Sequence, residues 1–222
     1  MSPIRMMKRH NENLQRLKGD IQSMNEIDYR IIDNTCVYGL EESVVASGYP
    51  MATHINPEMN KVTEKDAKRA LKLGSALAGS GHDCFLKGII AQFDLTFTEK
   101  VWPEAERYHF FEFVSSMSTM HMLSKMDIRY ISYTDKRIAD IFLEIVKEYV
   151  KNSSEDNWLR MIYSYPSGLL LTARITTNYL QLKTIYAQRK THRLSEWRQF
   201  CMWVEGLPLV KELGVVPNDS SV

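Results

Sequence analysis

Two segments of the chain alternate apolar and polar residues, which is the pattern of a β-strand with one buried face. In residues 91–98 the apolar positions are Ala91, Phe93, Leu95 and Phe97. In residues 169–178 they are Leu169, Leu171, Ala173 and Ile175. Residues 27–32 are a third candidate strand. The sequence therefore predicts a small β-sheet.

Most of the remaining sequence has the spacing or the capping residues of α-helices. Thr63 begins one of them, because its hydroxyl can accept a hydrogen bond from the amide of Asp66. Pro103 suits the first turn of another, which we expect to run through the aromatic stretch 108–113 and on toward Leu123. The other expected helices are residues 4–24, 37–47, 138–149, 179–189 and 195–206, and a short one capped by Ser153 or Ser154. Helices outnumber strands, so the predicted class is helix-rich α+β.

We find no internal repeat or low-complexity linker in the 222 residues, so we expect one domain over residues 1–222. Residues 1–24 are expected to form an N-terminal helical extension, and residues 217–222 a flexible tail. No window approaches the roughly 20 apolar residues that a membrane span requires. We therefore expect neither a signal peptide nor a membrane anchor.

Charge and cysteine content narrow the function classes further. The 28 basic and 27 acidic side chains nearly balance, so the molecule has no overall field that attracts nucleic acid. The three cysteines are far apart, odd in number and in no C-x-x-C arrangement, which argues against a disulfide framework or a zinc site. These thiols suit a reducing cytoplasm.

A polar residue stands at each end of the helix expected over residues 179–189. Asn178 and Arg189 are 11 positions apart, so they point within about 20° of each other and lie about 16 Å apart along the axis. Leu182 and Ile185 lie between them on the same face. Such a stripe suits a surface beside a flat heterocycle with hydrogen-bonding edges. The alternative is a core-facing helix that ends in an asparagine cap and a snorkelling arginine.

Two further polar clusters are candidates for binding or catalysis. Residues 188–193 place several cationic donors near a helix C-terminus, where they bind phosphate or simply complement the helix dipole. Residues 107–121 combine basic and hydroxyl side chains, and a helix there would put His109 and Ser116 on one side. A serine–histidine nucleophile pair is one interpretation, but neither histidine has a carboxylate partner or metal-ligand spacing.

Several features follow one another along the chain: a Gly81-His82 pair after a helix, a strand, His109 and Ser118 on either side of a polar stretch, Pro166 before a second strand, then Asn178 and Arg189. Their order resembles that of the flavin-dependent thymidylate synthases over residues 65–205. That family makes dTMP from dUMP with FAD, NADPH and methylenetetrahydrofolate, and its homotetramers have active sites between subunits. The resemblance implies a helix-rich α+β fold with a small antiparallel sheet, and a deoxyuridine nucleotide as the ligand.

The resemblance also implies roles for individual residues. Arg189 would contact the pyrimidine and favour its N3-ionised form, which makes it the candidate catalytic residue. The candidate substrate-binding residues are Ser118, His121, Arg160 and Arg189. The candidate flavin-binding residues are His82, Arg107, His109, Asn178 and Thr184. Hydride delivery by flavin at C5 needs no protein nucleophile.

The chain departs from the family at several cationic positions. The family has arginine on both sides of its signature histidine, where this chain has Tyr108 and Phe110, and Met120 replaces a third arginine. Each charge-assisted hydrogen bond contributes about 1.5 to 3 kcal/mol, so these losses weaken an FAD diphosphate site. The alternative function is a non-catalytic nucleotide-binding or assembly protein that keeps the fold without flavin. Nucleic-acid binding through residues 189–193 is disfavoured by the balanced charge.

Overall fold

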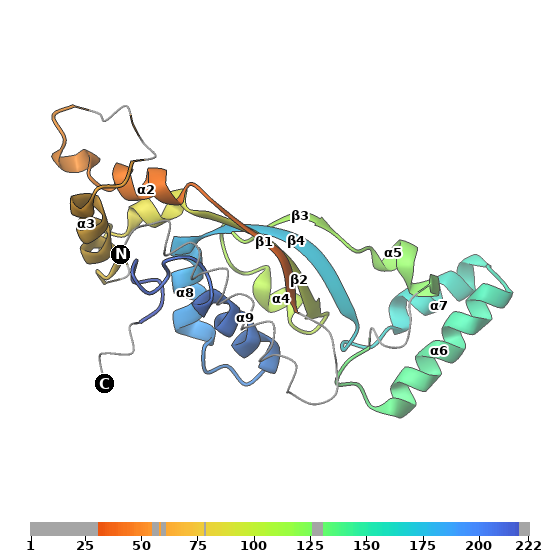
Figure 1. Ribbon diagram of the computed structural model, residues 1–222. Helices are drawn as coiled ribbons and strands as arrows, with labels where there is room; N and C mark the ends of the chain where they lie inside the picture. Colours follow the sequence, from red (N-terminus) through yellow and green to blue (C-terminus); the bar gives the residue numbers. More distant parts are fainter. Residues whose placement is uncertain (1–30, 55–57, 59–60, 78, 126–130, 218–222) are drawn as a thin grey trace.

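The computed structural model describes residues 31–54, 58, 61–77, 79–125 and 131–217. In this part of the chain a four-stranded antiparallel sheet has the order β1-β2-β4-β3 (Figure 1). Its strands are β1 (Ile32–Tyr38), β2 (Ile90–Thr98), β3 (Glu112–Ser116) and β4 (Leu170–Asn178). The predicted class, helix-rich α+β with a small antiparallel sheet, is confirmed.

Helices lie at both ends of the sheet and along one of its faces. Figure 1 shows α2 and α3 at one end, α5, α6 and α7 at the other, and α4, α8 and α9 along the face. The described α-helices are α2 (Leu40–Ala46), α3 (Glu64–Gly74), α4 (Trp102–Ala105), α5 (Thr119–Met122), α6 (Lys136–Lys151), α7 (Glu155–Ser164), α8 (Tyr179–Arg189) and α9 (Ser195–Glu205). Short 3-10 turns are η2 (Tyr49–Met51), η3 (Cys84–Gly88) and η4 (Leu123–Lys125). None of the helices in the described ranges is long and apolar enough to cross a membrane.

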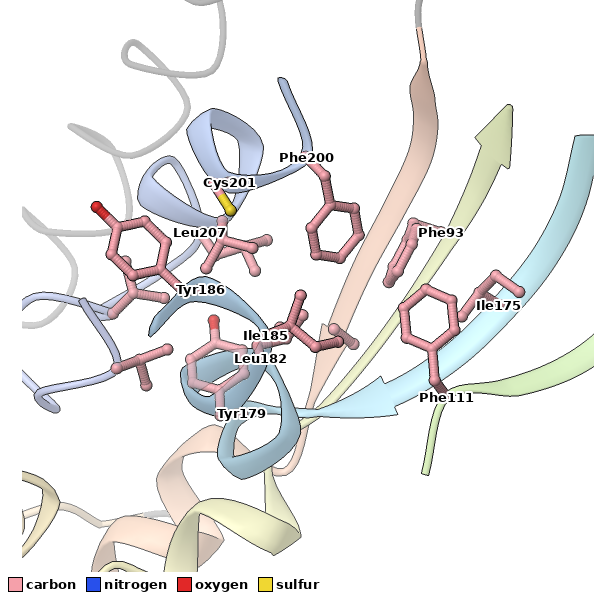
Figure 2. Packing of buried hydrophobic residues seen from close by; sticks show 14 of the residues in the cluster. Phe93, Phe111, Ile175, Tyr179, Leu182, Ile185, Tyr186, Phe200, Cys201 and Leu207 are labelled. Carbon is pink, nitrogen blue, oxygen red and sulfur yellow. The ribbon is translucent and has the colours of Figure 1, made fainter. Parts of the chain in front are cut away.

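The main core lies between the sheet and the helices α8 and α9. Phe93, Leu95 and Phe97 of β2 are fully buried, as the alternation predicts, while Asp94 and Thr96 between them are partly exposed. Figure 2 shows Phe93 beside Phe200 of α9, with Leu182 and Ile185 of α8 in the same cluster. The Phe93 and Phe200 ring centroids are 6.0 Å apart. The predictions of β2, β4, α8 and α9 are confirmed.

A second, smaller core holds α6, α7 and η4 together. Its buried members are Leu123, Phe142, Val146, Met161 and Leu169. Ser154 caps α7 by accepting a hydrogen bond from the Asn157 amide, so the expected cap is confirmed. The helix expected over residues 138–149 is also confirmed, although Ile138 and Ile141 on its apolar face are exposed.

The long helix expected from Pro103 toward Leu123 is wrong. Helix α4 ends at Ala105, and after a turn the chain forms the edge strand β3. Phe110 has a left-handed backbone with φ 58°, which a continuous right-handed helix does not allow. Pairing of β3 with β4 outweighs the local helix propensity of this stretch. His109 and Ser116 therefore do not share a helix face.

Three other boundaries differ from expectation. Thr63 caps α3 by accepting from the Asp66 amide at 3.2 Å, but the helix ends at Gly74, whereas the sequence predicts that it continues to Ala78. Residue 74 is a glycine at a close contact, because a Cβ there would collide with the carbonyl of Leu213. Helix α2 begins later than expected because the preceding residues belong to β1 and Gly39 turns with φ 71°. Strand β1 begins at Ile32, where the strand predicted over 27–32 was expected to end. The expected helix over 4–24, residues 27–30 and the tail beyond 217 lie outside the described residues.

Candidate functional site

Asn178 and Arg189 stand at the two ends of α8. The Asn178 side-chain oxygen accepts a hydrogen bond from the Gln181 amide at 2.9 Å, so this asparagine is the N-cap of the helix. Leu182 and Ile185 between the two ends are fully buried and lie in the core cluster (Figure 2). The stripe that joins Asn178 to Arg189 is therefore core-facing, which is the second of the two interpretations of the sequence.

Arg189 is held by side chains from three other segments. Its Nη1 donates to Glu104 Oε2 of α4 at 2.9 Å, and its Nε donates to the Tyr108 hydroxyl at 2.7 Å. Its guanidinium carbon lies 4.7 Å from the centroid of the Trp197 ring, whose Nε1 donates to the same Glu104 oxygen at 3.0 Å. Nη1 also lies 2.9 Å from His192 Nε2. Only 15% of the Arg189 side chain is exposed, so little guanidinium surface is left for a ligand in this arrangement.

A second ion pair joins the middle of α8 to the turn that carries His82. Lys183 Nζ lies 2.8 Å from Asp83 Oδ2, and the two side chains are 14% and 3% exposed. The same ammonium donates to the carbonyls of Gly74 and Ala76 at 2.8 and 3.0 Å, which also attaches the end of α3. The turn with the exposed His82 is thereby fixed against α8.

The turn between α4 and β3 reaches the C-terminal end of α8. Tyr108 donates from its hydroxyl to Gln188 Oε1 at 2.9 Å. Its neighbours Arg107 and His109 are exposed, and within the described ranges their side chains have no hydrogen-bond or ion-pair partner. Thr184 is exposed on α8 itself. The turn that carries His82 and the turn that carries Arg107 and His109 therefore both contact α8, the helix that carries Thr184.

The other candidate substrate-binding residues, Ser118, His121 and Arg160, lie on or beside other helices. Ser118 directly precedes α5, and His121 is exposed within that helix. Arg160 is exposed on α7 and pairs with Glu148 of α6 at 3.0 Å. Figure 1 shows α5 and α7 beyond one end of the sheet, whereas α8 lies along its face. In the described part of the chain, Arg189 contacts Glu104, Tyr108, His192 and Trp197 and none of these three residues.

Cys201 on α9 is the buried one of the three cysteines, and its environment argues against a role as a nucleophile. Burial, with a smaller contribution from the Glu205 carboxylate, raises the pKa of Cys201 to about 12 against the opposing effect of Arg189 and Lys190. The thiol stays protonated at neutral pH and is a poor nucleophile. Within the described residues no group of three or more histidine, cysteine or carboxylate side chains is arranged to hold a metal ion.

The sequence did not identify Glu104, Lys183 or Trp197 as partners of the candidate site. Glu104 was assigned only to the start of a helix, and it lies 85 positions from Arg189 in the chain. The position of Lys183 indicates a charged group that needs a partner, because it is a lysine between the buried positions Leu182 and Ile185 of a core helix. The partner of a lysine in such a place is set by the tertiary fold, so the pair with Asp83 could not be inferred from spacing.

The exposed residues around α8 fit a flavin nucleotide in part. The exposed candidates are His82, Arg107, His109 and Thr184. Arg107 is the one guanidinium among them, because the family's two arginine positions carry Tyr108, which is engaged with Arg189, and Phe110, which is 61% exposed. This set offers one arginine toward a diphosphate, together with imidazole and hydroxyl groups toward the ring system.

Comparison with known proteins gives a match in structure and none in sequence. No protein-family model and no curated protein matches the chain. The flavin-dependent thymidylate synthase ThyX from Helicobacter pylori, solved with FAD and dUMP, is similar with a TM-score of 0.64 at 12% identity, over 84% of this chain and 98% of that one. A second structure of thymidylate synthase X from Helicobacter pylori with FAD and dUMP gives 0.59 at 12% identity, over 83% and 95%. At this identity the likeness establishes the fold, which is the expected one.

Proposed function

We propose that this chain is a cytoplasmic enzyme that binds a deoxyuridine nucleotide and FAD and transfers a one-carbon unit to C5 of the pyrimidine, as the flavin-dependent thymidylate synthases do. The unit formed by β4 and α8 carries the proposal. It holds Asn178 and Arg189 at the family's spacing after Pro166, within a fold like that of an enzyme solved with FAD and dUMP. NADPH and methylenetetrahydrofolate are the proposed co-substrates.

Each candidate residue has a role in this proposal. Arg189 lies against the pyrimidine, where its positive charge stabilises the N3-ionised, electron-rich ring. Ser118 and Arg160 hold the nucleotide phosphate through hydrogen bonds, and His121 is a further substrate-binding residue. A bound flavin would supply the hydride chemistry at C5, and the residues that would hold it are His82, Arg107, His109, Asn178 and Thr184. The protonated thiol of Cys201 agrees with a reaction that needs no protein nucleophile.

The proposed site is shared between subunits of a homo-oligomer, a tetramer by resemblance to the family. Arg189 contacts α4 and α9, whereas Ser118, His121 and Arg160 lie on or beside α5 and α7, beyond one end of the sheet (Figure 1). A site that uses all four residues is completed when the α5–α7 end of one copy meets α8 of another. Strand β3 supports association, because it is an edge strand and all five of its residues are exposed.

Release of tritium from dUMP labelled at C5 tests the reaction, because the C5 hydrogen must leave before the product forms. We expect release that depends on FAD and on a reductant. Arg160→Gln should raise the KM for dUMP, whereas Arg137→Gln is the matched control, since Arg137 is another exposed arginine in an ion pair. If tritium stays on the nucleotide when FAD, reductant and folate are saturating, thymidylate synthesis is excluded.

The Arg189 network favours a second candidate function, a nucleotide-binding or assembly protein without flavin. Its guanidinium is engaged by Glu104 and Tyr108, and the family's arginine positions beside His109 are occupied by aromatic residues. The visible absorbance of the purified protein separates the two functions. A protein that is yellow as purified, or that stays yellow after added FAD is removed by desalting, supports the enzyme, and a protein that is colourless after the same treatment supports the second function.

A further inference from the structure

A cavity of about 630 Å³ opens beside the start of α9, and none of the residues proposed to contact the nucleotide or the flavin lines it. Its walls come from the end of β2, from residues 166–168 before β4, from residues 133–138 at the start of α6 and from residues 193–198. Sites for small organic ligands have volumes of about 300 to 1,000 Å³. The cavity is therefore large enough for a small organic molecule.

Three cationic side chains line the cavity: Lys100, Arg193 and Arg198. Lys100 and Arg193 are exposed, and in the part of the chain that the structure describes neither side chain has a hydrogen bond or an ion pair. Arg198 donates through Nη1 to the carbonyls of His192 and Arg193 at 2.6 and 2.8 Å, which leaves its Nη2 and Nε for a ligand. Two cationic side chains without partners, and part of a third, therefore line the same cavity.

The carboxylates of the same cavity are already satisfied. Glu196 is 3% exposed, and its two oxygens accept from the hydroxyls of Thr98 at 3.0 Å and of Ser195 at 3.4 Å. Asp135 accepts from Arg137 Nη2 at 2.9 Å. The lining thus carries three cations and two carboxylates, one of which is already paired with Arg137, so its balance of charge is positive and suits an anion.

Backbone and side-chain hydrogen bonds hold the walls in place. The Lys100 amide donates to the Ser167 carbonyl at 2.9 Å, and the Ser132 amide donates to the Gly168 carbonyl at 2.7 Å. The Tyr133 and Ser195 hydroxyls are 2.9 Å apart, which links the segment before α6 to the first turn of α9. Tyr133 also has a φ of 50°, a backbone strain of the kind that persists where surrounding structure enforces it, often at ligand sites.

We propose that this cavity binds the phosphate group of a small organic phosphate monoester. Lysine and arginine supply charge-assisted hydrogen bonds to phosphate oxygens, and the first turn of α9 adds a favourable dipole. Ile138, Pro166 and Leu194 line the cavity beside these cations and suit the carbon body of an ester, which free phosphate lacks. The site lies outside the proposed thymidylate synthase chemistry and does not depend on it.

Titration calorimetry of the full chain with glycerol 3-phosphate and with inorganic phosphate tests the proposal, without nucleotide or flavin. We expect both ligands to bind, the ester more tightly. The double variant Lys100→Gln with Arg193→Gln should raise the Kd for the ester by about tenfold or more, because each lost charge-assisted bond accounts for at least that factor. Neither side chain has an internal partner, so the variant should fold normally.

The double variant Lys72→Gln with Lys87→Gln is the matched control, since it removes the same charge from exposed positions outside the cavity. It should leave the Kd unchanged. Equal loss of binding in both double variants would assign the effect to net charge and overturn the site. Absence of binding by the unaltered protein at millimolar ester would also overturn it.

Discussion

The guanidinium of Arg189 and the carboxylate of Glu104 form an ion pair that is largely shielded from water. Nη1 and Oε2 are 2.9 Å apart, and the side chains are 15% and 21% exposed. The Trp197 indole donates to the same carboxylate oxygen, so the pair joins α4, α8 and α9. A nucleotide that uses Arg189 must share this guanidinium with Glu104 or displace it.

Arg189→Met should therefore lower the free energy of unfolding by about 3 kcal/mol, because it leaves Glu104 shielded and unpaired. If Arg189 served only to contact a ligand, Arg189→Met would leave the melting temperature nearly unchanged. Adding Glu104→Gln to the variant should recover part of the loss, since the uncompensated charge is removed. Urea unfolding of both variants checks the values. An unchanged midpoint for Arg189→Met combined with lost dUMP binding would show that Arg189 serves the ligand and not the fold.

Lys183→Met should destabilise the protein by about 3 to 5 kcal/mol, because Asp83 is 3% exposed and loses its counter-charge. The carbonyls of Gly74 and Ala76 lose their donor as well. The matched control is Lys68→Met, which removes an ion pair with Glu64 whose side chains are 76% and 83% exposed. The control should change stability by less than about 1 kcal/mol. Similar midpoints of the two variants in urea would show that the Lys183–Asp83 pair contributes no more to stability than the exposed Lys68–Glu64 pair.

The elements predicted correctly are those whose local pattern and tertiary environment agree. Strand β2 buries every second residue, and α8 begins at a capping asparagine and buries Leu182 and Ile185. Strand β3 was missed because all five of its residues are exposed, so it has no alternation of burial to detect. Its extended conformation comes from pairing with β4, far away in the sequence.

The candidate site was less predictable than the fold for the same reason. Spacing correctly placed Asn178 and Arg189 at the ends of one helix, but it could not indicate which groups surround them. The partner of Arg189 is 85 positions away and the partner of Lys183 is 100 positions away. Periodicity reports which face of an element is buried and says nothing about which residue of another element lies opposite.

Acid should remove the contribution of Asp66 to stability. The pKa of Asp66 is lowered, first by the hydrogen bond from Thr63 and also by Arg69. A carboxyl group whose pKa is lowered by folding stabilises the protein fully above its unfolded pKa, and this stabilisation disappears as the pH falls through the folded pKa. Asp66→Asn should thus be less stable than the unaltered protein at pH 7, and the gap should narrow below about pH 4. Denaturant unfolding at several pH values checks this, and a gap that stays constant into acid would contradict it.

The three cysteines should differ in reactivity. Cys36 and Cys84 are exposed, whereas Cys201 is buried and its pKa is raised to about 12, so its thiolate is scarce at neutral pH. A disulfide-exchange reagent should modify the first two in the folded protein, and Cys201 only after unfolding. Mass spectrometry of the labelled protein identifies the sites. Rapid labelling of Cys201 without unfolding would mean that α9 opens readily from the core.

The protein should be a homo-oligomer that depends on the edge strand β3. Val114 is the extra residue at the irregularity of this strand and is 58% exposed, with Phe113 beside it at 41%. Valine and phenylalanine on an unpaired edge favour association with another chain, and a lysine in such a place opposes it. Val114→Lys should therefore shift the mass measured by light scattering toward the monomer. Met51→Lys is the control, because Met51 is 89% exposed on η2, outside β3, α5–α7 and α8, and should leave the mass unchanged. If the unaltered protein is a monomer at micromolar concentration, a site shared between subunits is untenable.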